Sequence, residues 1–224
     1  MRFSAAKSGR RSQGYAAMDQ AALKPDAGFE TVEPAEQRAA RRYSLLIRPA
    51  KLVSPQGEFI CVLRDVSRTG VSAKLFHKLP RCEEYTLEMQ NGQAYQMAKV
   101  WERDGEAGFA FSSQVDIGTL IAEPSNFPKR GLRLDLSFPI TISAASVAHM
   151  AFVENFSQQG ARLVCSGKLA IDQSVMIEGD NLRAIRAKVR WRRGDCYGIV
   201  FDDTFSLRDF AQLVAQMQCP VLFE

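Results

Sequence analysis

The sequence is poor in the residues that build catalytic or metal centres. Its 224 residues include two histidines, His77 and His149, and neither has a cysteine or a second histidine at metal-ligand spacing. His149 lies in an apolar run, where a core or strand position explains it more simply than catalysis does. The sequence shows no Ser-His-Asp set, no phosphate-cradling GxxxxGKS loop and no metal cluster. We therefore expect a protein that is not an enzyme and that holds no metal or other cofactor.

Cysteines are scattered, and long apolar runs are absent. The five cysteines form no CxxC pair, and their odd number is typical of free thiols in a reducing compartment. The longest mostly apolar run, ITISAASVAHMAFV, spans 14 residues, whereas a helix needs about 20 apolar residues to cross a bilayer. No apolar segment follows the paired Arg10 and Arg11, as a secretion signal would require. We expect a cytoplasmic protein with no membrane span.

The composition is that of a globular protein with a mild excess of positive charge. Hydrophobic residues make up 46% of the chain and charged residues 24%, so a packed core can form. The net charge of +4 would help an anionic ligand to approach. It is far from the dense basic surface of a dedicated DNA-binding protein.

Two similar segments lie 90 positions apart, each between apolar runs. They are RDVSRTG at 64–70 and ENFSQQG at 154–160. Such segments are typical of turns, because Asp and Ser side chains bond nearby backbone and glycine permits a positive φ. The pairs that match at this offset include Asp65 with Asn155, Ser67 with Ser157, Gly70 with Gly160, Trp101 with Trp191, Arg103 with Arg193, Gly108 with Gly198 and Phe111 with Phe201. Because both tryptophans of the chain take part, the matches indicate two copies of one domain in tandem.

Short alternating segments predict strands in both copies. In the first copy they are LLIRPAKLV, EFICVLRDV, VSAKLF, YTLEMQ, AYQMAKVWE and AGFAFS, separated by the turn signals SPQG, SRTG, QNGQ and RDGE. In the second copy they are LSFPITIS, AHMAFVENF, ARLVC, SVMIE, LRAIRAKVRWR and YGIVFDD. Six short antiparallel strands favour a small closed barrel, which leaves no exposed sheet edge.

A helical pattern ends each copy. In the first copy it is VDIGTLIA, and in the second it is SLRDFAQLVAQM, with Ser206 as the expected cap. One face of the second helix carries Leu207, Phe210, Leu213, Val214 and Met217. The linker EPSNFPKRG has the prolines and glycine of a domain boundary. We predict a disordered tail at 1–35, with at most a marginal helix around 18–23, a first domain at 36–124 and a second at 125–224.

Basic residues precede the first strand of each copy. In EQRAARRYSLL, Arg38 and Arg42 are four positions apart and Arg41 adds a third positive charge. The second copy has Lys129 and Arg133 at the same spacing, and Arg133 matches Arg42 at an offset of 91. Guanidinium groups present planar forks that fit phosphate oxygens and the O6/N7 edge of guanine. An arm with two such groups could fold over an anionic nucleotide.

The order of these signals, RxxxR and then D/NxSxxG about twenty residues later, resembles the PilZ domain family. The residues that carry the resemblance are Arg38, Arg42, Asp65, Ser67 and Gly70. VWERDGEAGFAF and VRWRRGDCYGIVF are similar to the fifth and sixth strands of that family. The resemblance covers residues 36–122 and 128–220. It implies a mainly β fold of two tandem six-stranded antiparallel barrels, each followed by a C-terminal α-helix.

The resemblance also implies that the chain binds cyclic di-GMP. Arg38 and Arg42, with Arg41 beside them, would contact a guanine edge and the phosphates. Asp65 and Ser67 would contact the other guanine, since a carboxylate accepts from the N1–H and N2–H₂ donors of guanine. Gly70 would let the loop backbone approach closely.

The second copy departs from this pattern. Lys129 stands where the first arginine is expected, and a lysine cannot make the planar bidentate contact. Asn155 replaces the aspartate, which the family's motif permits, while Ser157 and Gly160 are kept. The candidate second site thus comprises Lys129, Arg133, Asn155, Ser157 and Gly160. We expect it to bind weakly or not at all and to serve as a packing platform.

The expected function is a cyclic di-GMP receptor that converts ligand binding into a conformational change controlling motility or exopolysaccharide output. A downstream protein partner is expected, although the sequence does not identify it. The alternative is a protein-interaction adaptor that keeps the PilZ fold without binding nucleotide. DNA or RNA binding is not expected, because the charges of RAIRAKVRWRR alternate with apolar residues and form one solvated strand face. We interpret Trp101 and Trp191 as packing at the barrel rim.

Overall fold

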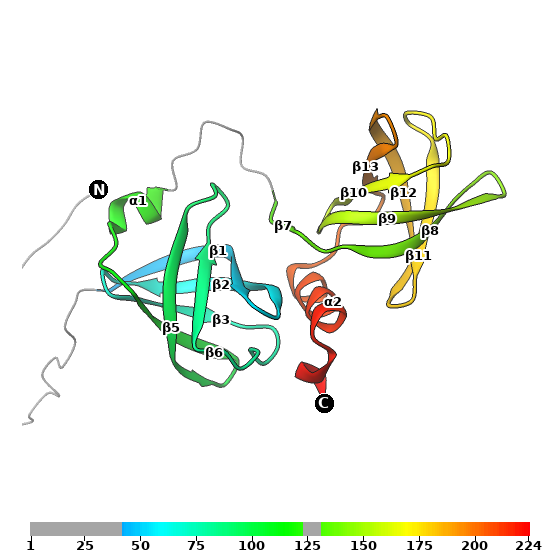
Figure 1. The fold of residues 1–224 in the computed structure, drawn as a ribbon. Coiled ribbons are helices and arrows are strands. Elements are labelled where there is room, and N and C mark those ends of the chain that lie inside the picture. The colour runs from blue at the N-terminus through cyan, green and yellow to red at the C-terminus, as the bar shows by residue number, and fades with distance from the viewer. Residues whose placement is uncertain (1–41, 123–130) are drawn as a thin grey trace, which may run out of the picture. The chain divides into compact units, whose positions relative to one another are not determined.

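A computed structural model describes residues 42–122 and 131–224, except for the side chains of residues 46 and 47, and shows a mainly β protein with two barrels (Figure 1). The predicted tail at 1–35 and most of the linker lie outside the described residues. The domain boundaries therefore stay predictions.

The first barrel closes six antiparallel strands in the order β1-β2-β3-β6-β5-β4. Its strands are β1 (Tyr43–Ser54), β2 (Gly57–Val66), β3 (Gly70–Lys74), β4 (Glu84–Glu88), β5 (Ala94–Arg103) and β6 (Glu106–Phe111). Pairing of β1 with β4 closes the ring. The short helix α1 (Ile117–Ala122) follows, as the pattern VDIGTLIA predicts.

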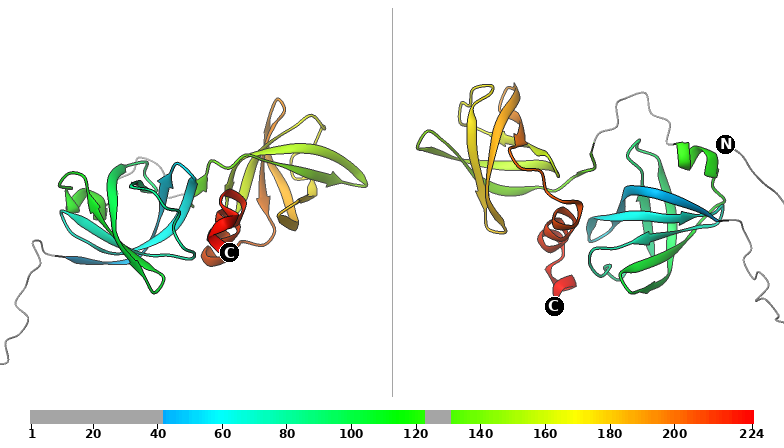
Figure 2. Two further views of the ribbon diagram at one scale, coloured as in Figure 1. Left: turned by 60° about the horizontal axis from the view of Figure 1, so that its bottom comes forward. Right: turned by 180° about the vertical axis from the view of Figure 1, so that it is seen from behind.

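The second barrel repeats this topology. Its strands are β8 (Phe138–Ala144), β9 (Val147–Ser157), β10 (Gly160–Cys165), β11 (Ser174–Gly179), β12 (Leu182–Arg193) and β13 (Cys196–Phe201). The order β10-β13-β12-β11-β8-β9 closes through the β9–β10 pairing. The predicted fold class and the tandem repeat are confirmed (Figure 2).

A two-residue strand that the sequence pattern does not predict precedes the second barrel. In β7 (Arg133–Leu134), Leu134 pairs with Phe156 of β9. In the first copy Tyr43 pairs with Val66 in the same way, as the continuous start of β1. Arg42 and Arg133 therefore hold equivalent positions, which explains why this part of the repeat matches at an offset of 91.

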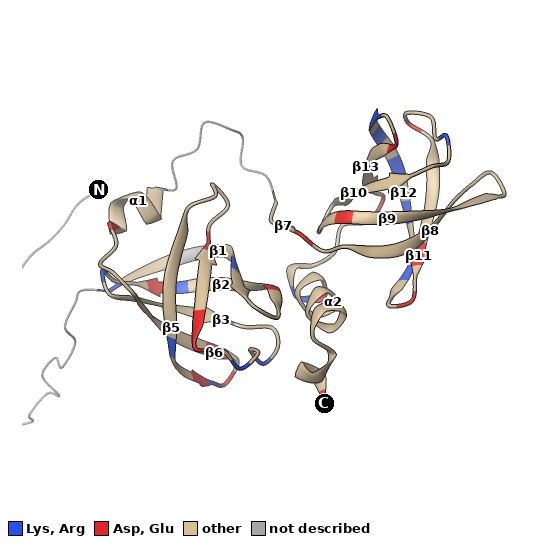
Figure 3. Cartoon of the chain, in the orientation of Figure 1, with Lys and Arg blue, Asp and Glu red and all other residues tan. Residues whose placement is uncertain are grey.

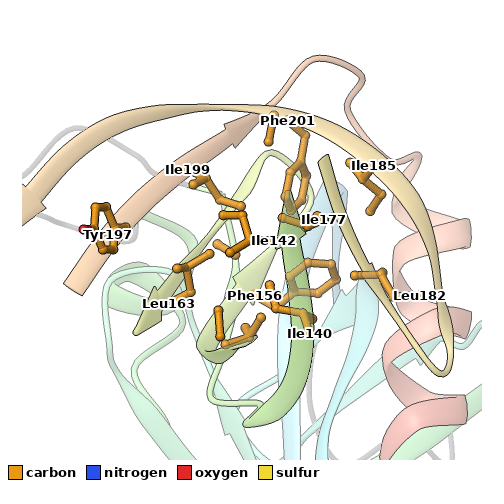
Figure 4. Packing of buried hydrophobic residues seen from close by; sticks show 14 of the residues in the cluster. Ile140, Ile142, Phe156, Leu163, Ile177, Leu182, Ile185, Tyr197, Ile199 and Phe201 are labelled. Carbon is orange, nitrogen blue, oxygen red and sulfur yellow. The ribbon is translucent and has the colours of Figure 1, made fainter. Parts of the chain in front are cut away.

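The apolar residues of alternate strand positions fill each barrel. In the second barrel, Phe156 is fully buried, and the ring centroids of four other phenylalanines lie 5.5–6.0 Å from its own; they are Phe138, Phe201, Phe205 and Phe210 (Figure 4). Burial of such aromatic side chains dominates the stability of a small core. Because Phe210 belongs to the final helix, that helix is part of the barrel's core.

The final helix, α2 (Leu207–Gln218), contributes to both cores. Its Ser206 cap is confirmed, since the backbone N–H of Asp209 donates to Ser206 Oγ at 3.1 Å. Phe210 and Val214 lie in the core of the second barrel, whereas Ala215 belongs to the core of the first. The sequence pattern predicts the first of these faces but not the second.

Gln218 joins α2 to strand β2. The backbone N–H of Glu58 donates to Gln218 Oε1 at 2.8 Å, and Gln218 Nε2 donates to the carbonyl oxygen of Glu58 at 2.7 Å. Gly57, with a φ of +137°, leaves room for this amide, because a Cβ there would overlap the Gln218 side chain. The contact therefore depends on a glycine at position 57.

The Glu58 carboxylate contacts two further groups. It accepts from Lys51 Nζ at 3.1 Å and from the backbone N–H of Asp135 at 2.9 Å. Lys51 also pairs with Glu88 at 3.0 Å, and its side chain is 8% exposed. Burial alone would lower the pKa of Lys51, but the hydrogen bonds and charges of Glu88 and Glu58 raise it above its usual value. The cation is thus held between two carboxylates.

We predict that Gln218→Ala lowers the stability of the fold. It removes the two hydrogen bonds to Glu58 and a third from Gln218 Nε2 to the carbonyl oxygen of Val214. Each has a net contribution of about 1 kcal/mol, so the free energy of unfolding should fall by about 1–3 kcal/mol. Urea denaturation followed by circular dichroism measures the change. Gln216→Ala is the matched control, because Gln216 is an exposed glutamine on the same helix. Equal denaturation midpoints for the two variants would contradict the role of the Gln218 amide.

All five cysteines are free, and two of them, Cys61 and Cys165, are buried. Burial raises the pKa of the Cys61 thiol to about 12, an effect that its hydrogen bond to the carbonyl oxygen of Ala50 only partly opposes. Cys61 therefore remains protonated, and a protonated thiol is a poor nucleophile.

We predict that Cys61 does not react with a thiol reagent in the folded protein at pH 8. Labelling followed by peptide mass spectrometry should modify Cys82, Cys196 and Cys219, which are partly exposed. Labelling in denaturant, which should modify all five thiols, is the control. Fast modification of Cys61 in the native protein would contradict its burial.

Candidate functional site

The loop between β2 and β3 is held by the Ser67 hydroxyl. Ser67 Oγ donates to the carbonyl oxygen of Gly70 at 3.2 Å and accepts from the backbone N–H of Gly70 at 3.1 Å. A backbone bond from Ser67 N–H to the same carbonyl measures 2.8 Å. Ser67 is 7% exposed. Its hydroxyl therefore shapes the loop, as a serine turn does, and presents little surface to a ligand.

Gly70 brings the loop close to strand β6. A Cβ on Gly70 would lie 2.5 Å from the carbonyl oxygen of Phe109, which no side chain can do. In the second copy a Cβ on Gly160 would overlap the carbonyl oxygen of Ile199 in the same way. Neither glycine has a positive φ, so a left-handed backbone conformation is not the reason for glycine at these positions. Close approach of two backbones is the reason for glycine at both positions.

Asp65 is oriented by two serines. Ser44 Oγ donates to Asp65 Oδ1 at 2.7 Å, and Ser72 Oγ donates to Asp65 Oδ2 at 3.3 Å. Both serines face Asp65 across the sheet, because Asp65 pairs with Ser44 of β1 and with Ser72 of β3. The carboxylate is consequently fixed in position, and the side chains that donate to it among the described residues are the neutral hydroxyls of these two serines.

These residues line one pocket on the first barrel. Its volume is about 190 Å³. The lining residues are Arg42, Asp65, Ser67, Thr69, Gly70, Val71, Ser72, Val100, Trp101, Gly108, Phe109 and Ala110. Among them Arg42 and Asp65 are the charged side chains, so the pocket offers one cation and one fixed anion.

Trp101 forms a wall of this pocket. Its indole lies on the backbone of Gly108, where a Cβ would overlap the ring. A β-bulge between Lys99 and Trp101 turns the indole toward Gly108, with which Trp101 pairs. Arg103 covers the indole, with its guanidinium carbon 5.4 Å from the ring centroid. The rim packing predicted for Trp101 is thus accompanied by a place in the pocket.

The second barrel has a pocket at the equivalent position, with a volume of about 490 Å³. It is lined by Gly131, Arg133, Asn155, Ser157, Gln158, Gln159, Gly160, Ala161, Arg162, Arg190, Trp191, Gly198, Ile199, Val200 and Thr204. Ser157 Oγ donates to the carbonyl oxygen of Gly160 at 2.9 Å, and Trp191 lies on Gly198. The second copy therefore builds the same loop and the same tryptophan wall.

Comparison with protein families finds a match to the PilZ domain at residues 128–218. The match covers the second barrel with α2, whose strand topology the first barrel repeats. The second barrel with α2 therefore matches a PilZ domain. The matched residues belong to the second copy, in which Lys129 stands in place of the first arginine of the RxxxR pattern.

Solved structures include PilZ proteins of low similarity, and no curated protein sequence matches the chain. The PlzA protein of Borreliella burgdorferi in complex with c-di-GMP is 11% identical, with 77% of this chain and 88% of that chain covered and a TM-score of 0.33. The inhibitor of motility MotI/DgrA of Bacillus subtilis is 12% identical, with coverage of 77% and 98% and a TM-score of 0.32. The PilZ domain of CeSA from a cellulose synthesizing bacterium is 16% identical, with coverage of 40% and 97% and a TM-score of 0.30. Likenesses of this size carry no argument about the site.

The two barrels bring together the predicted residues that the structure describes. Arg42, Asp65, Ser67 and Gly70 line the first pocket, and Arg133, Asn155, Ser157 and Gly160 line the second. Arg38, Arg41 and Lys129 lie outside the described residues. Their roles stay predictions.

Several lining residues of the two barrels are missed by motif reading. Ser44 and Ser72, which orient Asp65, are ordinary polar positions on predicted strands, and only the cross-strand register shows that they contact it. Arg190 of the second pocket lies in RAIRAKVRWRR, which was interpreted as a solvated strand face, whereas Arg162 lies in the predicted strand ARLVC and was given no role. Alternation with apolar residues places Arg190 on an outer face, but it does not show that this face borders the loop.

We predict that Gly108→Ala disturbs the first pocket by displacing Trp101. The added methyl group overlaps the indole, and such overpacking costs about 1–3 kcal/mol of stability. In a Trp191→Phe background, where Trp101 is the remaining tryptophan, the fluorescence emission maximum should shift. Gly118→Ala in α1, where a Cβ meets its nearest atom at 3.4 Å, is the control. An unchanged spectrum and melting temperature would contradict the packing of Trp101 on Gly108.

Proposed function

We propose that this protein is a receptor for cyclic di-GMP and that its first barrel carries a binding site. The observation that supports this most directly is the convergence of Arg42, Asp65 and the Ser67–Gly70 loop on one pocket. These are the residues that the PilZ resemblance assigns to the ligand. We propose that the site serves binding rather than catalysis.

The fixed carboxylate of Asp65 supplies base selectivity. An ionised carboxylate accepts hydrogen bonds and donates none, and the N1–H and N2–H₂ groups of guanine form a matching pair of donors. Ser44 and Ser72 donate hydrogen bonds to the two carboxylate oxygens of Asp65, so the carboxylate is already oriented before a base binds. Such preorganisation lowers the entropy lost when the base is bound.

The arginines supply affinity for the two phosphates of the ligand. Arg42 lines the pocket, and its guanidinium can bind phosphate or the guanine O6/N7 edge bidentately. Arg38 and Arg41 are proposed to add further charge-assisted bonds of about 1.5–3 kcal/mol each. Ordering the arm costs about 1–2 kcal/mol per residue, so several such bonds are needed. We expect ligand binding to order the segment from Arg38 to Arg42 on the barrel.

The output of the receptor is proposed to be a conformational change that acts on a downstream protein and thereby on motility or exopolysaccharide production. The five free cysteines are consistent with a reducing compartment, which is the basis for placing the receptor in the cytoplasm. In the described part of the chain, helices fall short of the length and apolar character that a membrane crossing requires.

The second candidate function is a protein-interaction adaptor with a PilZ fold. It is favoured by exposed apolar side chains on β9, where Met150 is 64% exposed and Phe152 is 54% exposed. Adjacent exposed apolar side chains of this size often mark protein contact surfaces. The titration below decides between the two functions, because an adaptor of this kind would release no heat with the nucleotide.

We predict that the protein binds cyclic di-GMP in calorimetric titration at physiological salt, and binds GTP and cyclic di-AMP much more weakly. Arg42→Ala should remove the first-barrel site or weaken it about tenfold to a hundredfold, the effect of losing one charge-assisted bond. Asp65→Ala should do the same and should also reduce the preference for guanine.

The matched control is Arg64→Ala. Arg64 is adjacent to Asp65 but lies outside the pocket lining and pairs with Glu106 at 3.5 Å. Its removal should leave both affinity and stoichiometry at the parent values. Parent-like binding by Arg42→Ala and Asp65→Ala, in folded protein, would show that the site is assigned to the wrong residues.

A further inference from the structure

The two equivalent pockets carry different charge. Among the described lining residues, the first pocket has one arginine, Arg42, balanced by Asp65. The second has three arginines, Arg133, Arg162 and Arg190, and no carboxylate. Figure 3 shows basic residues along β12, the strand that carries Arg190. Among the described lining residues, the second pocket therefore carries the greater positive charge.

Arg162 occupies the place that Ser72 holds in the first barrel. It pairs with Asn155 on one neighbouring strand and with Gly198 on the other. Ser72 pairs with Asp65 and Gly108 in the same register. The serine that orients the carboxylate in the first copy is thus replaced by a cation beside the amide of Asn155.

Arg190 occupies the place of Val100. Each is the extra residue of a β-bulge, located between Val189 and Trp191 in one copy and between Lys99 and Trp101 in the other. Val100 is 66% exposed, and the Arg190 side chain is 60% exposed. The bulge therefore presents an aliphatic side chain to the first pocket and a guanidinium group to the second.

The ion pairs of these arginines leave them able to bind a ligand. Arg162 Nε lies 2.7 Å from Glu154 Oε2, and Arg190 Nη1 lies 3.4 Å from Asp172 Oδ1. Both pairs are substantially exposed, and exposed pairs contribute little net energy. Neither Glu154 nor Asp172 lines the pocket. A phosphate can bind the guanidinium forks from the pocket side without displacing a buried carboxylate.

The polar groups beside the arginines are neutral amides. Asn155 stands in place of Asp65, and Gln158 and Gln159 also line the pocket. Gln158 Nε2 donates to the carbonyl oxygen of Phe205 at 3.0 Å, which fixes that side chain. An amide offers both a donor and an acceptor, so it does not select the two-donor face of guanine as a carboxylate does. Base selectivity should consequently be weaker at this site.

We propose that the second barrel is a phosphodiester-binding nucleotide site in which Arg162 and Arg190, on the barrel wall, supply the bidentate guanidinium contacts that Lys129 cannot make. The ligand class, a cyclic dinucleotide, rests on the proposed function. The site depends on phosphate contacts more than on base contacts and is less selective for guanine than the first. This differs from the expectation that the second copy is a packing platform, because that expectation considered only the arm and the loop.

The test isolates each barrel within the full-length protein. Arg42→Ala disables the first pocket, and the double substitution Arg162→Ser with Arg190→Val gives the second pocket the residues of the first. Calorimetric titration with cyclic di-GMP should show two sites in the parent protein and one in Arg42→Ala. The triple variant, which combines Arg42→Ala with Arg162→Ser and Arg190→Val, should show none. Each removed charge-assisted contact should lower the affinity at least about tenfold. The site that remains in Arg42→Ala should weaken steeply with salt and should bind cyclic di-AMP within about tenfold of cyclic di-GMP.

Glu154→Gln is a further test variant, which should raise the affinity of the second pocket where the wall substitutions lower it. It removes the partner of Arg162 while keeping the shape of the side chain, so affinity at the second pocket should rise a few-fold. The matched control is Glu178→Gln, on β11, whose carboxylate makes no ion pair among the described residues and is remote from the lining. Unchanged or weaker binding by Glu154→Gln would argue against phosphate contact by Arg162.

The outcomes separate this inference from the proposed function. One site in the parent, lost in Arg42→Ala and kept in the wall double variant, would refute the second site and leave the first intact. One site kept in Arg42→Ala and lost in the wall double variant would support the second site and refute the assignment of the first. Binding that the wall double variant retains in an Arg42→Ala background would overturn the role of both wall arginines. Melting temperatures of all variants verify that each is folded.

Discussion

The approach of one strand backbone to its neighbour at Gly70 is the constraint on which the binding loop depends. Because no Cβ stands between Gly70 and the carbonyl oxygen of Phe109, β3 enters the barrel directly from the loop. Ser67 can then close the loop by bonding both backbone groups of Gly70. Asp65 is left facing outward between two serines. Gly160 reproduces the constraint in the second copy, where the loop has the same form but different side chains around it.

Sequence periodicity was sufficient for the architecture and for the residues of the loop. Alternation predicted the strands, and the offset of 90 predicted that two barrels would share one topology, because residues at equivalent positions face equivalent neighbours. The helical face of Phe210 and Val214 was predicted for the same reason. Periodicity does not show which residue of the neighbouring strand a side chain contacts. The bulges at Val100 and Arg190 shift the register by one residue, and the role of Ser72 follows only from its pairing with Asp65.

The motif suggested ligand contacts for residues that, in the structure, shape the loop. A D/NxSxxG loop suggests three groups aimed at a ligand, yet Ser67 is buried within the loop and Gly70 serves a backbone contact. Asp65 and Arg42 remain as the described polar groups of the motif that face the pocket. The second copy keeps the two structural members, Ser157 and Gly160, and the arginine, Arg133, but has Asn155 in place of Asp65. The two copies therefore differ in side chains that face the pocket and share the residues that shape the loop.

The dual packing of α2 has a consequence for how such a duplicated gene can change. Ala215 completes the core of the first barrel and Gln218 caps the backbone of Glu58, although both are encoded at the end of the second repeat. A deletion or recombination event that removes the second repeat would also remove part of the first. The first barrel thus depends on residues that are encoded in the second repeat.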